Sequence, residues 1–104
     1  MTKICYKSAR GFFSDEFELC MDGHAGFNPG NDIVCSALSC LFFALANYLE
    51  DIGAKPLVEY DAASGRGYIK CHGFIRVQWA FRFCVFAFRM LESVYPDNVC
   101  VIYL

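Results

Sequence analysis

The spacing of the apolar residues changes several times along this chain, and the order of the changes restricts the folds open to it. Two long segments carry polar residues at helical spacing within an apolar background, which predicts helices at residues 33–52 and 75–94. Strand-like segments lie at residues 2–10, 12–21, 57–60, 68–72 and 98–104. The order ββαββαβ predicts a single α+β domain over residues 1–104, with an antiparallel-type sheet and two helices.

The size and charge of the chain limit the classes of function. A chain of 104 residues can bury one core without a metal or a disulfide. The net charge is −2 with no long run of like charges, so we expect no direct contact with nucleic acid. The hydrophobic fraction of 57% is high for one small domain, which favours a homodimer. The aromatic residues of the second helix are expected in the core or the dimer interface, and some could line an apolar groove; they are Trp79, Phe81, Phe83, Phe86 and Phe88.

Two features bear on location. Residues 1–10 lack the apolar core of a secretory signal. The apolar runs at 37–46 and 77–91 are bounded or interrupted by polar and charged residues, and neither reaches the ~18–20 uncharged residues of a spanning helix. The expected location is therefore cytoplasmic, without a membrane contact.

The seven cysteines contain no C-x-x-C pair, which argues against a structural zinc site. Most are expected to be reduced and to act as small buried hydrophobes, with Cys5 and Cys20 filling the core across the first hairpin. His72 follows Cys71, but packing at a strand end accounts for this pair better than a metal does. We expect neither a metal nor an organic cofactor.

The segment with the strongest chemical signal joins the first hairpin to the first helix. Residues 23–31 are rich in glycine and asparagine, which predicts a loop, and Asp32 is a good N-cap. Cys35 then lies in the first turn, where the helix dipole favours the thiolate, and His24 one loop away could act as its general base. First-turn N–H groups could donate to an oxyanion. The alternative reading is that Cys35 only packs.

The same residues resemble a known family. Gly23-His24-Ala25, a short glycine-containing loop and then Asp32-Ile33-Val34-Cys35 are similar to the signature of the ribosomal-processing cysteine proteases, the Prp family. The resemblance implies a dimeric cysteine endopeptidase, with Cys35 as nucleophile and His24 as base. It further implies a substrate, the N-terminal extension of large-subunit ribosomal protein twenty-seven, which is cut after a pair of aromatic residues.

The resemblance also assigns supporting positions. Asp32 matches the motif aspartate and would either cap the helix or orient His24. Ser39 matches a family serine that would line the site. Gly23 belongs to the motif. We treat the loop from Gly26 to Gly30 as a gate by hypothesis, and the alternative is a plain surface turn. The chain departs from the family at Ser36, where alanine is usual, which concerns substrate preference more than catalysis.

Two other classes of function stay open at this point. The chain could be a non-catalytic module that binds a peptide or a ribosomal partner on the same fold. It could also be a redox-sensing thiol protein, in which Cys40 would resolve an oxidised Cys35.

Overall fold

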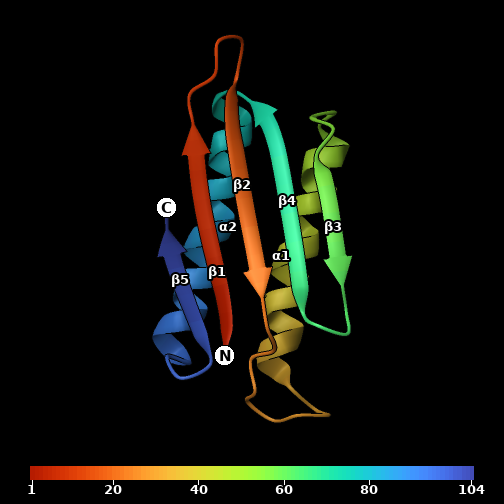
Figure 1. Cartoon of the computed structure of the whole chain (residues 1–104), viewed down its shortest axis with the longest axis vertical. Coiled ribbons are helices and arrows are strands. Elements are labelled where there is room, and N and C mark those ends of the chain that lie inside the picture. Colours follow the sequence, from red (N-terminus) through yellow and green to blue (C-terminus); the bar gives the residue numbers. More distant parts are fainter.

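The computed structural model describes residues 1–104 and shows one sheet with both helices packed on the same face (Figure 1). In chain order the elements are β1 Thr2–Ala9, β2 Asp15–Asp22, α1 Ile33–Asp51, β3 Leu57–Asp61, β4 Arg66–Gly73, α2 Ile75–Val94 and β5 Val99–Tyr103. The predicted α+β class and the order ββαββαβ are confirmed.

The five strands lie in the order β3-β4-β2-β1-β5. Neighbouring strands are antiparallel except β1 and β5, which are parallel. Parallel neighbours need a crossover connection, and α2 lies in the chain between β4 and β5, so it makes the return to the far edge of the sheet. The sheet is therefore mostly antiparallel, with one parallel pair at the β5 edge.

The core lies between the sheet and the two helices. Alternate strand residues such as Leu19 and Ile69 are 0% exposed and meet Phe42 of α1 and Phe81 of α2, which are also 0% exposed. This is the period-2 pattern of a sheet with one covered face. The aromatic residues of α2 divide between two environments: Phe81 and Phe88 are in the core, whereas Trp79, Phe83 and Phe86 are exposed.

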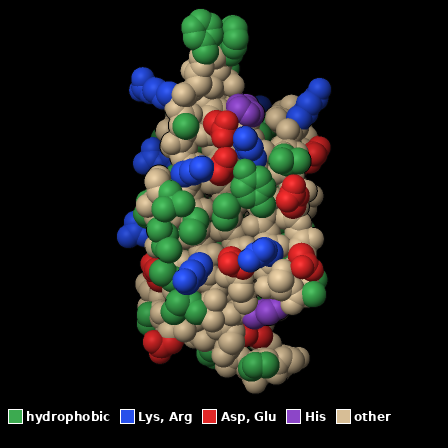
Figure 2. Space-filling view, viewed as in Figure 1, with side chains coloured by type: hydrophobic (Ala, Val, Ile, Leu, Met, Phe, Trp, Pro, Cys, Tyr) green, Lys and Arg blue, Asp and Glu red, His purple; other side chains and the backbone are tan.

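The other face of the sheet is free of helices and carries charges of both signs (Figure 2). Lys70 pairs with Glu16 at 3.3 Å, and Lys7 pairs with Glu18 at 3.4 Å. Exposed pairs of this kind add little to stability.

The prediction that Cys5 and Cys20 fill the core is wrong. They do lie directly opposite each other in the β1–β2 register, but they are half-buried on the uncovered face. Ile4 and Tyr6 flank Cys5 and point into the core, so strand alternation turns the Cys5 thiol outward. The same alternation turns Cys20 away from its buried neighbours on β2.

The tip of the first hairpin also differs from the prediction. The second strand begins at Asp15 rather than at residue 12, so residues 10–14 form the connecting loop. Phe12 and Phe13 are consequently on the loop and are 93% and 85% exposed. Their high strand propensity suggested pairing, but the chain turns back between Gly11 and Ser14, so tightly that a Cβ added at Gly11 would collide with the Ser14 carbonyl oxygen. Hydrophobic side chains stand out at this tip in Figure 2.

Helix α1 is long and apolar enough to cross a membrane by length and composition, with 19 residues and a mean hydropathy of 1.7. The sequence-based expectation was that no segment would reach this length. In the structure α1 packs on the sheet through Val34, Leu38 and Phe42, which are at most 2% exposed. A core helix gives the same signal, so the hydropathy alone is weak evidence for a membrane span.

Candidate active site

His24 and Cys35 lie at the same end of the molecule, although ten residues of loop and helix start separate them. His24 follows the end of β2, and Cys35 is in the first turn of α1. Both line a cavity of about 290 Å³ that also includes Leu38, Ser39 and Tyr60. The structure therefore brings together the predicted nucleophile, the predicted base and the predicted lining serine.

The sulfur of Cys35 receives a hydrogen bond from the backbone. The Ala25 N–H donates to Cys35 Sγ at 3.2 Å. Ala25 itself is 1% exposed and its carbonyl accepts from Asn98 Nδ2 at 3.0 Å, so this residue is held from both its N–H and its carbonyl side. Ala25 was not singled out from the sequence, because a backbone group leaves no residue-type signal.

Asp32 is the N-cap of α1, as predicted. Its Oδ1 accepts from the Val34 and Cys35 N–H groups, each at 2.9 Å, and its Oδ2 accepts from the Phe27 N–H at 2.9 Å. Burial acts to raise the pKa of Asp32, but hydrogen bonds from the backbone of Cys35, Asn28 and Phe27 outweigh it, so the pKa lies below its usual value. None of its hydrogen bonds reaches His24, so its observed role is to cap α1 and to hold the preceding loop.

The expectation that the first-turn N–H groups are free to bind an oxyanion is wrong for three of them. Asp32 Oδ1 occupies the Val34 and Cys35 N–H groups, and the Asp32 carbonyl accepts from the Ser36 N–H at 3.1 Å. A capping side chain accepts hydrogen bonds from the N–H groups that have no partner within the helix. These N–H groups are then no longer free to bind an oxyanion. The N-cap, which the sequence did indicate, therefore removes the oxyanion donors that we inferred beside it.

Replacing Asp32 with asparagine should weaken the fold in a pH-dependent way. Asparagine keeps one capping oxygen but loses the charge and the second acceptor, so at neutral pH the free energy of unfolding should fall by about 1 kcal/mol. The Asp32 pKa is lowered in the folded state, so its stabilisation is present above the unfolded pKa and lost as pH falls through the folded one. The difference between wild type and Asp32→Asn should therefore shrink in acid.

Urea unfolding of both proteins at neutral and at strongly acidic pH measures this difference. Asp97→Asn is the matched control, because Asp97 is exposed and its side chain makes no hydrogen bond. It should leave stability unchanged at both pH values. An equal loss for Asp32→Asn at both pH values would contradict the capping role of the charge.

The turn between β3 and β4 orients His24. Its Nε2 lies 3.0 Å from the Ala63 carbonyl oxygen, and since a carbonyl only accepts, Nε2 carries the proton. The other nitrogen, Nδ1, is then left with a lone pair and can act as a base. Gly65 allows this approach: a Cβ there would lie 2.8 Å from the Gly23 carbonyl oxygen and 3.2 Å from His24 Nδ1. The sequence showed only a hairpin at this turn, without its contact to His24.

No hydrogen bond joins His24 and Cys35 in this structure, although they share one cavity. Each is held by a different backbone group, His24 by Ala63 and Cys35 by Ala25. Hydrogen bonds between catalytic groups are often long or unformed until a substrate binds. The arrangement places a thiol and an imidazole at the same cavity, where both can contact one bound group.

The predicted glycine positions have backbone roles. Gly23, Gly26 and Gly30 have φ of 92°, 72° and 92°, in the left-handed region that glycine tolerates best. The Gly23 carbonyl also accepts from Thr2 Oγ1 at 2.9 Å. Within the loop, the Phe27 ring packs edge-on to Tyr95, with centroids 5.3 Å apart. The loop is therefore held at several points, and its movement as a gate stays a prediction.

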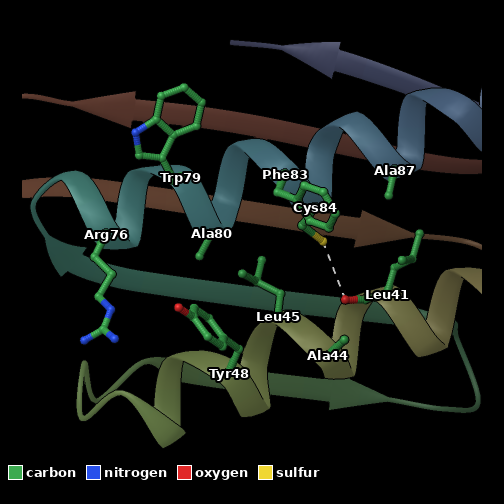
Figure 3. A pocket seen from close by; sticks show the side chains of 10 residues that line it. All are labelled: Leu41, Ala44, Leu45, Tyr48, Arg76, Trp79, Ala80, Phe83, Cys84 and Ala87. Atoms are coloured by element: carbon green, nitrogen blue, oxygen red, sulfur yellow. Dashed lines mark hydrogen bonds between the residues drawn. The ribbon is translucent and has the colours of Figure 1, made fainter.

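A second and larger groove lies between the two helices, on the side away from the sheet (Figure 3). Its volume is about 560 Å³, and nine of its ten lining residues are hydrophobic. Trp79, Phe83 and Tyr48 belong to it, but neither His24 nor Cys35 does. Two aromatic residues of α2, Trp79 and Phe83, thus line an apolar groove, but a different one from the cavity that His24 and Cys35 share.

The remaining candidates do not converge on a site. Cys71 is in the core, whereas His72 is on the uncovered face with its Nε2 3.8 Å from Glu16. No group of three His, Cys, Asp or Glu side chains is arranged to hold a metal. Cys40 is exposed, and five positions along α1 turn it about 140° away from Cys35, so the two thiols cannot meet while the helix is intact.

Comparison with known proteins settles the family. The profile of the family described as cysteine protease Prp matches residues 1–100. The chain belongs to the Prp cysteine protease family. Its sequence resemblance around His24 and Cys35 is therefore part of a match along nearly the whole chain. No curated protein matches the chain.

Solved structures share the Prp fold over the full chain. The ribosomal processing protease Prp from S. aureus, solved with a covalently linked product peptide, is 23% identical with a TM-score of 0.80, and both chains are covered completely. The same protein with a substrate peptide is 21% identical with a TM-score of 0.79, again over both full chains. SMU.848 from Streptococcus mutans is 27% identical with a TM-score of 0.76, covering all of this chain and 94% of that one.

Proposed function

We propose that this Prp-family chain is a cysteine endopeptidase that removes the N-terminal extension of large-subunit ribosomal protein twenty-seven in the cytoplasm. The observation that carries the proposal is the cavity that Cys35 and His24 share. In it, Cys35 accepts a hydrogen bond from the Ala25 N–H, and a hydrogen bond to the Ala63 carbonyl orients His24. The S. aureus protein of the same fold is a ribosomal processing protease and was solved with a substrate peptide. That parallel supports the substrate class.

The proposed reaction uses Cys35, His24 and water. His24 Nδ1 takes the thiol proton, and Cys35 Sγ attacks the scissile carbonyl carbon to form a tetrahedral intermediate. The intermediate collapses to a thioester as His24 passes the proton to the leaving amine. Water, deprotonated by His24, then hydrolyses the thioester and returns the free thiol.

The cavity walls support cleavage after aromatic residues. Met21, Leu38 and Tyr60 give the cavity an apolar side. The Tyr60 ring is itself held edge-on against Phe43, with centroids 4.8 Å apart, so this wall is a fixed aromatic surface. Such a surface binds an aromatic side chain better than a charged or small one.

A peptide that contains the extension tests the proposal. Wild type should cut it after the aromatic pair, and a matched peptide with alanine at both aromatic positions should be cut at least about tenfold more slowly. Mass spectrometry of the products locates the bond. If the natural peptide stays intact, the endopeptidase function is overturned.

A second candidate is a non-catalytic peptide-binding module, because no hydrogen bond joins His24 to Cys35. Alkylation distinguishes the two functions. An endopeptidase should show Cys35 reacting with iodoacetamide faster than the exposed Cys40 at neutral pH, since only the thiolate reacts. A binding module should show Cys35 reacting no faster than Cys40.

We also propose that the protein acts as a homodimer through the outer face of the helices. The groove between α1 and α2 is floored by small residues such as Ala44 and Ala80, and the large exposed ring of Phe83 lies on it. A groove beside a protruding ring is self-complementary under twofold symmetry, because each copy can offer its ring to the groove of the other.

Phe83→Glu should convert this dimer to a monomer, since a charge at the centre of an apolar interface is left unpaired. Sedimentation velocity measures the change. Phe12→Glu is the matched control, because Phe12 is at least as exposed as Phe83 but lies on the hairpin tip, and it should stay dimeric. A dimer that survives Phe83→Glu would place the interface elsewhere.

A further inference from the structure

The tip of the β1–β2 hairpin carries an exposed aromatic pair. Phe12 and Phe13 are the two most exposed large hydrophobic residues of the chain, at 93% and 85%. Their rings pack only against each other in this loop, edge-on with centroids 4.8 Å apart. A small residue, Ser14, follows the pair. Exposing two adjacent rings to water is unfavourable in free energy, and an exposed apolar patch of this kind often marks a binding site. We therefore infer that the tip binds a partner.

The loop that bears the pair is easily made extended. None of the backbone hydrogen bonds outside the helices and strands involves residues 10–14, and no side-chain hydrogen bond involves them either. A protease must bind its substrate as an extended segment, and local opening of a loop without hydrogen bonds costs little free energy. Residues 10–14 can therefore open without breaking the sheet.

The tip cannot reach the cavity of its own chain. Figure 1 shows the β1–β2 loop at one end of the long axis and the start of α1 at the other. The molecule is 44 Å long, and eight residues of β2 alone span about 27 Å. Only a second copy can offer its tip to a given active site.

We propose that one copy cleaves the hairpin tip of another between Phe13 and Ser14, a self-processing activity in trans. The inference rests on the proposed endopeptidase function and on the apolar wall of Leu38 and Tyr60 as the binding surface for the phenylalanine rings. It adds a second substrate, which is a folded copy of this same chain. It also adds a modification site, the Phe13–Ser14 bond.

The step is a hydrolysis. Cys35 Sγ of one copy attacks the Phe13 carbonyl carbon of the other, and the C–N bond to Ser14 breaks. The Ser14 nitrogen leaves as an amine with the proton from His24, and water releases the Phe13 carboxylate from the thioester. The cut chain stays assembled, because β1 remains paired with both β2 and β5. Cleavage thus opens the loop while keeping the sheet.

The test uses two copies that mass spectrometry can tell apart. Unlabelled wild type is incubated with ¹⁵N-labelled Cys35→Ala, which is a substrate but not a catalyst. After denaturation, labelled fragments 1–13 and 14–104 should appear. Labelled Cys35→Ala that also carries Phe12→Ala and Phe13→Ala lacks both rings. It should be cut at least about tenfold more slowly than labelled Cys35→Ala. Unlabelled Cys35→Ala in place of wild type should give no fragments.

The same sample is tested in parallel with the aromatic-pair peptide. If the peptide is cut and the labelled chain stays intact, self-processing is overturned while the endopeptidase function stands. If neither is cut, both are overturned. If the chain without the two phenylalanines is cut equally fast, the tip does not direct cleavage and the inference fails.

Discussion

Cys35→Ala should abolish cleavage of the aromatic-pair peptide, and His24→Ala should have nearly the same effect. Removing the thiol removes the proposed nucleophile, which is the only thiol among the residues that line the cavity. Removing the imidazole leaves the thiol without a base and the amine without a proton donor. Groups that act as a unit give similar losses, so each variant should lower kcat/KM by a factor of at least about 10³.

Both variants should stay folded. Cys35 is only half-buried, and the His24 hydrogen bond to Ala63 is exposed, so neither side chain carries the core. Circular dichroism and urea unfolding measure this directly. Cys40→Ala is the matched control for thiol loss on the same helix and should keep full activity. Cleavage by folded Cys35→Ala at a rate near that of wild type would exclude Cys35 as the nucleophile.

Gly65→Ala should lower kcat/KM by about tenfold to a hundredfold through a displacement of His24. The added Cβ would lie 2.8 Å from the Gly23 carbonyl oxygen and 3.2 Å from His24 Nδ1, so one of these groups must move. The Gly23 carbonyl belongs to the backbone, so it moves less easily than the His24 side chain does. The imidazole is therefore pushed from its position on the Ala63 carbonyl, which holds its proton on Nε2.

Gly53→Ala separates this effect from backbone strain. Gly53 has a φ of 76° against 69° for Gly65, but no atom lies within 4 Å of its added Cβ. Both variants should lose about 1 kcal/mol of stability from the left-handed conformation. Only Gly65→Ala should lose activity, and the loss should appear in kcat more than in KM. Equal activity in the two variants would show that the position of His24 does not depend on this turn.

The sequence was informative where a residue type itself carries the signal. Strand alternation and helical spacing predicted all seven elements, since the sheet has one covered face and the helices have one buried stripe. Asp32 was readable as a cap because few residues serve there. His24 and Cys35 could be singled out because few side chains can act as base and nucleophile; the structure shows that they line one cavity, and their catalytic roles stay a prediction.

The remaining parts of the site could not be read in this way. Ala25 and Ala63 act through a backbone N–H and a carbonyl, which every residue has, so their identity predicts nothing. The contact between His24 and Ala63 also spans 39 positions and depends on the path of the sheet. The tip residues were misassigned for a different reason, because strand propensity describes Phe12 well but says nothing of where a turn closes.

The hydrogen bond from Asn98 to the Ala25 carbonyl has a consequence for protein synthesis. Ala25 donates its N–H to Cys35 Sγ, and its carbonyl is held by Asn98, a residue made 73 positions later. Asn98 also fixes the start of β1 through the Thr2 N–H at 2.9 Å. A nascent chain on the ribosome therefore has Cys35, the proposed nucleophile, long before it has the contacts that fix this residue in place. Cleavage competence should arrive abruptly, once residue 98 has left the exit tunnel and β5 has docked, and not gradually during translation.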